Sequence, residues 1–120
     1  MFYIHLYRFL GYSANNRLQT SCLTETFYPQ ALERARSLDT HLRETGKPIG
    51  PLHGLPVSIK DSFNVKGLQA TIGFVSYLKQ EPAKTNSTLV DLLLDLGAVL
   101  YVKTNIPQTL MVMTLPATQR

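Results

Sequence analysis

An α/β domain, with helices packed on a mixed or parallel sheet, is the fold class that this sequence predicts. Segments with the composition of strands alternate along the chain with segments that have the periodicity of helices. Residues 98–103 form a nearly unbroken apolar run with three β-branched or aromatic positions, which is typical of a strand buried on both faces. A chain of 120 residues forms about one small domain, so we expect these elements to share one core.

The clearest helix signal lies in residues 29–45, after a short strand predicted over residues 21–26. Pro29 suits the first turn of a helix, and Gly46 suits the position just past its end. Apolar residues recur at spacings of three and four, with charged residues on the opposite side: Leu32, Ala35, Leu38 and Leu42. This segment is therefore expected to be an amphipathic helix.

Between this helix and the next, the sequence predicts loops around one short strand. Two prolines and a glycine in residues 47–51 favour a loop. Residues 56–61 predict a short strand and residues 64–67 a turn, whereas residues 68–73 fit either a strand or a loop. Residues 81–86 are polar and predict a linker.

A second helix is expected to begin at Ser87 or Thr88 and to end at Gly97. Thr88 and Asp91 have the spacing of a capping box. Its predicted apolar face consists of Leu89, Leu92, Leu93 and Leu96. The buried strand that follows is expected to return to the sheet by a right-handed crossover, and residues 104–107 lead towards another short helix.

Composition and charge exclude several classes of function. A hydrophobic content of 44% and a charged content of 17% indicate a folded globular protein. The net charge of +4 is dispersed among acidic residues, so nucleic-acid binding is not expected, and a small basic binding domain has only that charge in its favour. No segment has the length of a membrane span.

The cysteine and histidine content points away from a disulfide and from a metal site. Cys22, the single cysteine, cannot form an intrachain disulfide and is expected to be a small buried residue. The three histidines lack the spacing of metal ligands. An intracellular, cytoplasmic location is the default.

Lys60 is the candidate catalytic residue. Alternating burial in the strand would place it in the core, where desolvation lowers the pKa of a lysine and favours the neutral amine that acts as a base. Ser58 and Ser62 lie two residues away on either side and share its face if the strand stays extended. A lysine beside a serine is a known base–nucleophile pairing. The alternative is that Lys60 ends its strand and pairs with Asp61 or solvent.

Residues 50–61 (GPLHGLPVSIKD) resemble the lysine-bearing motif of the amidase signature family. Further segments follow in the family's order: NVKG at 64–67, TIG at 71–73, STLV at 87–90 and GAVLYVKTNIPQTLM at 97–111. The resemblance covers about three quarters of the chain, from Cys22 to Met111, and is most similar to fungal acetamidase-like and fatty-acid-amide-hydrolase-like members. Several ordered motifs are more specific than one short match.

This resemblance implies an α/β/α fold with a mixed sheet, no metal or organic cofactor, and hydrolysis of carboxylic-acid amides to an acid and an amine or ammonia. It implies that Lys60 is the base of a Ser-cisSer-Lys triad, acting through a bridging serine on a second, nucleophilic serine. Both serines belong to a Gly/Ser-rich segment that also supplies the oxyanion hole. No such segment occurs in these 120 residues.

The chain is therefore expected to be an N-terminal fragment of an amidase, truncated before the serine-rich segment and inactive by itself. The predicted division is a poorly assigned segment over residues 1–20, the N-terminal part of an amidase signature domain over 21–111, and a divergent tail over 112–120. The alternative is a non-catalytic interaction module that forms a homo- or hetero-oligomer through an exposed sheet edge.

Other candidate residues are expected to have structural roles. Neither Ser58 nor Ser62 is expected to be a working nucleophile. His53 is expected to fix its loop by a hydrogen bond rather than to act in catalysis. Thr71 and Gly73 either line a pocket or form a turn, and the turn is favoured. Lys103, at the end of a buried strand, is expected to form a structural ion pair or hydrogen bond.

Overall fold

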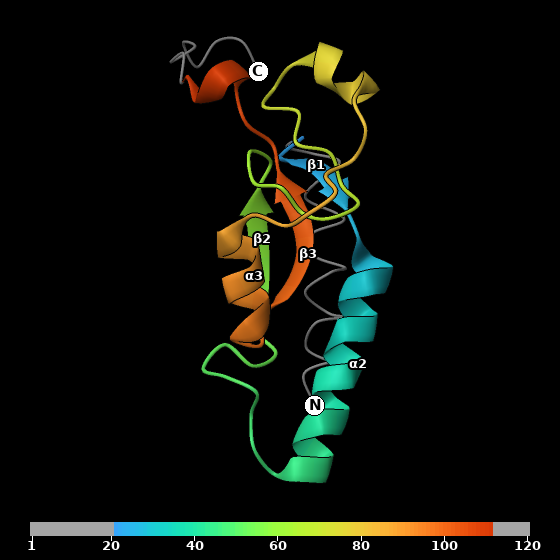
Figure 1. Ribbon diagram of the computed structural model, residues 1–120, viewed down its shortest axis with the longest axis vertical. Coiled ribbons are helices and arrows are strands. Elements are labelled where there is room, and N and C mark those ends of the chain that lie inside the picture. Colours follow the sequence, from blue (N-terminus) through green and yellow to red (C-terminus); the bar gives the residue numbers. More distant parts are fainter. Residues whose placement is uncertain (1–20, 112–120) are drawn as a thin grey trace.

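The computed structural model of the protein describes residues 21–111, and the predicted segments 1–20 and 112–120 lie outside these residues. Its longer elements, in chain order, are β1 (Leu23–Thr26), α2 (Tyr28–Thr45), β2 (Pro56–Lys60), α3 (Thr88–Asp95) and β3 (Val99–Thr104). Two short 3-10 helices, η1 (Val75–Lys79) and η2 (Gln108–Leu110), complete the described part. The order of strand, helix, strand, helix and strand confirms the predicted fold class (Figure 1).

The three strands form one mixed sheet in the order β1-β3-β2. The central strand β3 is antiparallel to β1 and parallel to β2, and each pairing contains one register shift. Because β3 is flanked on both sides, its residues from Val99 to Lys103 are all buried, as the apolar run predicted. β2 lies at an edge of the sheet and has only one fully buried residue, Ile59.

Helix α2 begins and ends almost where the sequence predicts. A proline lies in its first turn, and Gly46 adopts a left-handed conformation at φ 68° from which its N–H donates to the carbonyl of Leu42 at 2.9 Å. Its buried residues are Ala31, Ala35 and Leu38, so Ala35 and Leu38 are buried as predicted, and Leu32 packs partly buried against them. These side chains pack against β3.

The predicted apolar face of α3 is wrong for Leu89 and Leu92, whereas Leu93 packs against the core as predicted. Val90 is its fully buried residue, whereas Leu89 and Leu92 are 41% and 53% exposed. Val90 packs with Ile59 and Leu100 of the sheet. The polar residues Thr88, Asp91 and Asp95 share one side of α3, and its apolar residues cover the broad remainder. Packing on the sheet selects the part of this broad apolar side, around Val90, that is buried.

The predicted capping box is also wrong. Ser87 occupies the N-cap position, but no side-chain hydrogen bond caps the helix. Asp91 instead accepts a hydrogen bond from Asn86 Nδ2 at 2.7 Å. The Asn86 side chain also accepts from the N–H of Lys66 at 2.7 Å, so it joins the start of α3 to the loop after β2. Gly97 follows the end of the helix with φ 92°, as a helix stop requires.

The two helices are joined directly as well as through the sheet. Arg34 of α2 donates from Nη2 to the carbonyl oxygen of Leu94 in α3 at 2.7 Å. Figure 1 shows η1 and η2 together at the end of the molecule to which β2 and β3 point. The segments that follow the parallel strands therefore gather at one end, where sites of α/β proteins usually form.

Candidate active site

Lys60 is the last residue of β2 and lies at this carboxyl end of the parallel strand pair. It pairs with Thr104 of β3, and the next residue, Asp61, donates its N–H to the Thr104 carbonyl at 3.1 Å. The Lys60 carbonyl accepts from the N–H of Phe63 at 3.0 Å. Backbone hydrogen bonds on both sides thus fix the position of Lys60.

The prediction that Lys60 is buried is wrong. Ile59 is the core residue of the strand, at 4% exposure, while Ser58 and Lys60 are both exposed. Side chains of β2 do alternate between two sides, but the side that faces the core carries the apolar residues and the side that faces solvent carries the lysine. The strand ends at Lys60, so Ser62 lies in the following turn and not on the extended face with Ser58.

The loop before β2 is attached to the end of α3. The N–H groups of Leu52 and Gly54 donate to the carbonyls of Leu96 and Gly97 at 3.0 and 2.8 Å. His53 Nδ1 accepts from the N–H of Ile49 at 3.1 Å, which confirms its predicted role in fixing the loop. These contacts set the point at which the chain enters β2 and hence the placement of Lys60.

Asp61, the residue after Lys60, is completely buried. Its Oδ2 accepts from the N–H groups of Thr71 and Ile72, both at 2.9 Å, and from the Thr71 hydroxyl at 3.0 Å. Its Oδ1 accepts from the hydroxyl of Thr24 at 3.2 Å. A buried carboxylate with this many donors is well satisfied.

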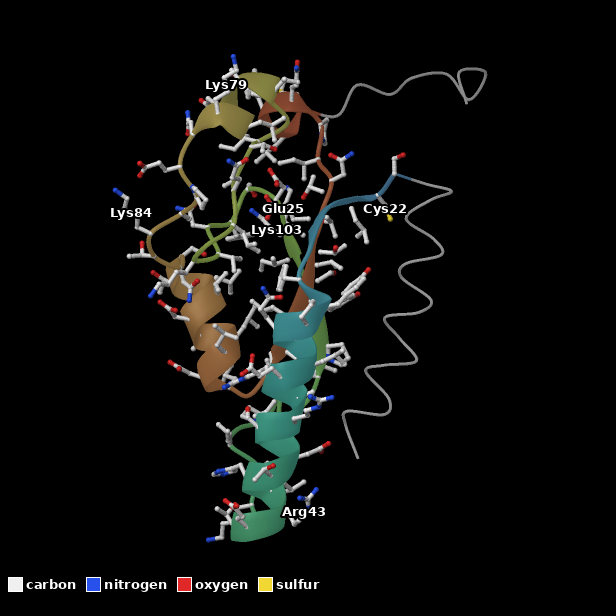
Figure 2. The ribbon with its side chains drawn as sticks, turned by 90° about the vertical axis from the view of Figure 1, so that its right-hand side faces the viewer. Cys22, Glu25, Arg43, Lys79, Lys84 and Lys103 are labelled. Carbon is white, nitrogen blue, oxygen red and sulfur yellow. The ribbon has the colours of Figure 1, made fainter. Side chains whose placement is uncertain are left out.

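Lys103 is the cation that faces this carboxylate. Its side chain is fully buried, its Nζ lies 3.7 Å from Asp61 Oδ1, and it donates a hydrogen bond to the carbonyl of Gln69. Burial lowers the pKa of Lys103 below its ordinary value, and the carboxylates of Asp61 and Glu25 act in the opposite direction. Figure 2 shows Lys103 and Glu25 together, away from the peripheral Lys79 and Lys84. The predicted structural role of Lys103 is confirmed.

Asp61 is the residue that sequence reasoning missed. The sequence suggested it as a partner of its neighbour Lys60, whereas its side chain pairs with Lys103, 42 positions away. The only signal for this pairing was a lysine in a strand buried on both faces, because such a lysine needs an anion nearby.

Residues Thr71 to Gly73 form the favoured turn. Phe74 donates its N–H to the Thr71 carbonyl at 2.9 Å, and Ile72 and Gly73 have φ of 50° and 75°. A Cβ at Gly73 would lie 2.8 Å from the Cα of Gln108, so only glycine lets the turn approach η2 this closely. The turn is therefore held by Asp61 on one side and by η2 on the other.

A groove of about 340 Å³ lies apart from Lys60. It is bounded by α2, the loop after β2, the end of α3 and β3. It is lined by Phe27, Gln30, Arg34, Val65, Lys66, Gly67, Leu68, Asn86, Leu94 and Leu100. Because Lys60 is absent from this lining, the groove and the candidate base are separate features.

The expected burial of Cys22 is wrong, because this cysteine is exposed just before β1 (Figure 2). Among residues 21–111, no three His, Cys, Asp or Glu side chains are grouped to hold a metal ion. In the same residues, no helix is long and apolar enough to cross a membrane.

Comparison with known proteins places these features in a family. The profile of the amidase family matches residues 8–118. An amidase of Gibberella moniliformis is 54% identical over 93 residues, covering 78% of this chain and 18% of the relative. The acetamidase of Emericella nidulans is 46% identical over 93 residues, covering 78% of this chain and 17% of the relative.

A solved structure agrees with the sequence relatives. A fatty acid amide hydrolase is 38% identical, with a TM-score of 0.74, and the match covers 79% of this chain and 16% of that chain. This chain therefore spans less than a fifth of the curated relatives described above. The matched residues include β2 with Lys60 and β3 with Lys103. The chain belongs to the amidase family.

Proposed function

We propose that Lys60 is the general base of an amide-hydrolysing site and that these 120 residues contribute the base without the nucleophile. The observation that carries the proposal is the placement of Lys60. It lies within the motif at residues 50–61, at the carboxyl end of parallel strands, with its backbone held by Thr104 and Phe63. Substrates are amides of carboxylic acids, and the products are the acid and an amine or ammonia.

The chemistry needs parts that the 120 residues do not include. A lysine base acts by removing a proton from a serine hydroxyl, directly or through a bridging serine, so that the serine oxygen can attack the amide carbonyl. The Gly/Ser-rich segment that carries such serines in the family does not occur in this sequence. Lys60 is also exposed, so water-excluding surroundings must come from another part of an amidase. We therefore expect no turnover by this polypeptide alone.

A hybrid enzyme tests the role of Lys60. The segment of this chain aligned with the Emericella nidulans acetamidase would replace its counterpart there, with acetamide as substrate. Lys60→Ala is expected to lower kcat by at least about a thousandfold, because a positioned base contributes about 10²- to 10⁴-fold and the nucleophile also depends on it. Lys79→Ala, an exposed lysine in η1, is the matched control and should leave kcat unchanged.

Two outcomes would contradict the proposal. A hybrid that hydrolyses acetamide equally well with Lys60→Ala would remove Lys60 from the mechanism. Turnover by the isolated 120-residue chain, abolished by Lys60→Ala, would show that the expected inactivity is wrong.

A second candidate is a non-catalytic module that associates with another chain. Its support is that β2 is an edge strand of the described sheet and that Leu89 and Leu92 of α3 are exposed. Size-exclusion chromatography with light scattering would test it. A monomer at high concentration that recruits no amidase polypeptide would count against this candidate.

A further inference from the structure

The buried pair of Asp61 and Lys103 is the feature of the described residues that the proposed chemistry leaves unused. The side chain of Lys103 is 0% exposed and that of Asp61 is 1% exposed. Two buried charges are costly to remove from water, and an apolar pair of similar volume often stabilises a protein as well or better. Stability is therefore a weak reason for this pair, and its contacts indicate a more specific one.

Those contacts all lead to the end of the sheet where Lys60 lies. Asp61 follows Lys60 directly and binds the N–H groups of Thr71 and Ile72. Lys103 precedes Thr104, the strand partner of Lys60, and donates to the carbonyl of Gln69. One ion pair thus connects the ends of β2 and β3 to both sides of a single loop.

The loop held in this way has little freedom of its own. Ile72 adopts φ 50°, which a β-branched residue rarely does. Its carbonyl accepts from the N–H of Thr109 at 3.2 Å, and Gly73 packs directly on Gln108. Without the carboxylate of Asp61, the N–H groups of Thr71 and Ile72 would lose their partners, and this strained turn would lose its main restraint.

We propose that Asp61 and Lys103 are positioning residues, which hold the loop of residues 69–73 and the backbone of Lys60 in one fixed arrangement for catalysis. The proposal rests on the proposed role of Lys60 as the base. Neither residue is assigned a contact with substrate. Asp61 supplies the acceptor that orients the turn, and Lys103 neutralises Asp61 while anchoring the loop at Gln69.

The first experiment uses the intact 120-residue chain and amide hydrogen exchange. Asp61→Ala alone leaves Lys103 buried without its anion and can unfold the chain. Asp61→Ala combined with Lys103→Met removes both charges and is expected to keep the fold, which far-ultraviolet circular dichroism checks. In this double variant, exchange at the amides of Thr71 and Ile72 should accelerate at least about tenfold, with the amide of Leu38 in the core of α2 unaffected.

Two exposed residues provide matched controls for the same substitutions. Asp95→Ala at the end of α3 and Lys79→Met in η1 should change none of these exchange rates. If the amides of Thr71 and Ile72 stay protected in the folded double variant, the ion pair does not hold the loop and the proposal is overturned.

The second experiment reads catalysis in the acetamidase hybrid. Asp61→Ala with Lys103→Met should lower kcat by about 10- to 100-fold and leave KM within about threefold, because the base is displaced while substrate contacts are retained. Unchanged kcat in a folded hybrid would overturn the positioning role even if the loop had become mobile.

The two proposals fail in different ways. If Lys60 is not the base, the hybrid with Lys60→Ala keeps its full kcat, whatever the effect of substitutions at Asp61. If Asp61 and Lys103 do not position the loop, the double variant shows normal amide exchange in the 120-residue chain or normal kcat in the hybrid. The hybrid still loses activity with Lys60→Ala in that case.

Discussion

Replacing Gly97 by alanine should destabilise the fold through a contact with the loop that leads into β2. Gly97 has φ 92°, and a Cβ there would lie 2.9 Å from the Cα of His53 and 3.2 Å from its N. The left-handed backbone costs an alanine about 1–2 kcal/mol, and overpacking costs about 1–3 kcal/mol more. The less flexible unfolded chain returns about 0.4–1 kcal/mol. The net loss in the free energy of unfolding is about 1–5 kcal/mol, with a central value of about 3 kcal/mol.

Gly46→Ala is the control that isolates the packing contribution. Gly46 is also left-handed, at φ 68°, but a Cβ there meets nothing within 4 Å. Its expected cost is about 1 kcal/mol or less, from the backbone alone. Urea unfolding followed by far-ultraviolet circular dichroism gives both values. If the two variants differ by less than about 0.5 kcal/mol, the contact between Gly97 and His53 does not fix the loop as argued.

Two further predictions concern α3 and the buried lysine. Val90→Ala should lower the free energy of unfolding by about 2–3 kcal/mol, because it removes two buried carbons and leaves a cavity. Leu89→Ala, at a residue that is 41% exposed, should lower it by less than about 1 kcal/mol. A larger decrease for Leu89→Ala in urea unfolding would show that the predicted face is the buried one. Because burial lowers the pKa of Lys103 in the folded state, the unfolded chain binds more protons between the two pKa values, and stability rises with pH in that window. The free energy of unfolding, relative to that of Lys103→Met, should therefore increase from the lowered pKa up to the ordinary lysine pKa of about 10.4, and a difference that falls over this range would refute the assignment.

The sequence predicted those elements whose signals are local. Helix α2 was placed to within one residue because a proline and a glycine mark its ends. Strand β3 was recognised because burial on both faces leaves a continuous apolar run. The buried part of α3 was predicted less well, since its apolar side is broad and contact with Ile59 and Leu100 selects Val90 within it.

The candidate site was predicted in part for the same reason. The motif around Lys60 identified the candidate base and its strand, but the environment of its side chain depends on which side of the strand faces the core. The side that faces the core is the one that carries the apolar residue Ile59, and not the one that carries the lysine. The partner of Lys103 depends on a pairing between distant strands, which a single sequence does not show.

The contrast between the two lysines follows from the strand order. Lys103 lies on the central strand, so neighbours on both sides remove it from water and it requires Asp61. Lys60 lies on an edge strand, and within residues 21–111 no further strand pairs with β2. A lysine base needs surroundings that exclude water without a carboxylate partner, whereas Lys60 here has a fixed backbone and an exposed side chain. In the acetamidase hybrid, additional protein against β2 would bury Lys60 without moving it, because hydrogen bonds to Thr104 and from Phe63 already fix the backbone on both sides of it.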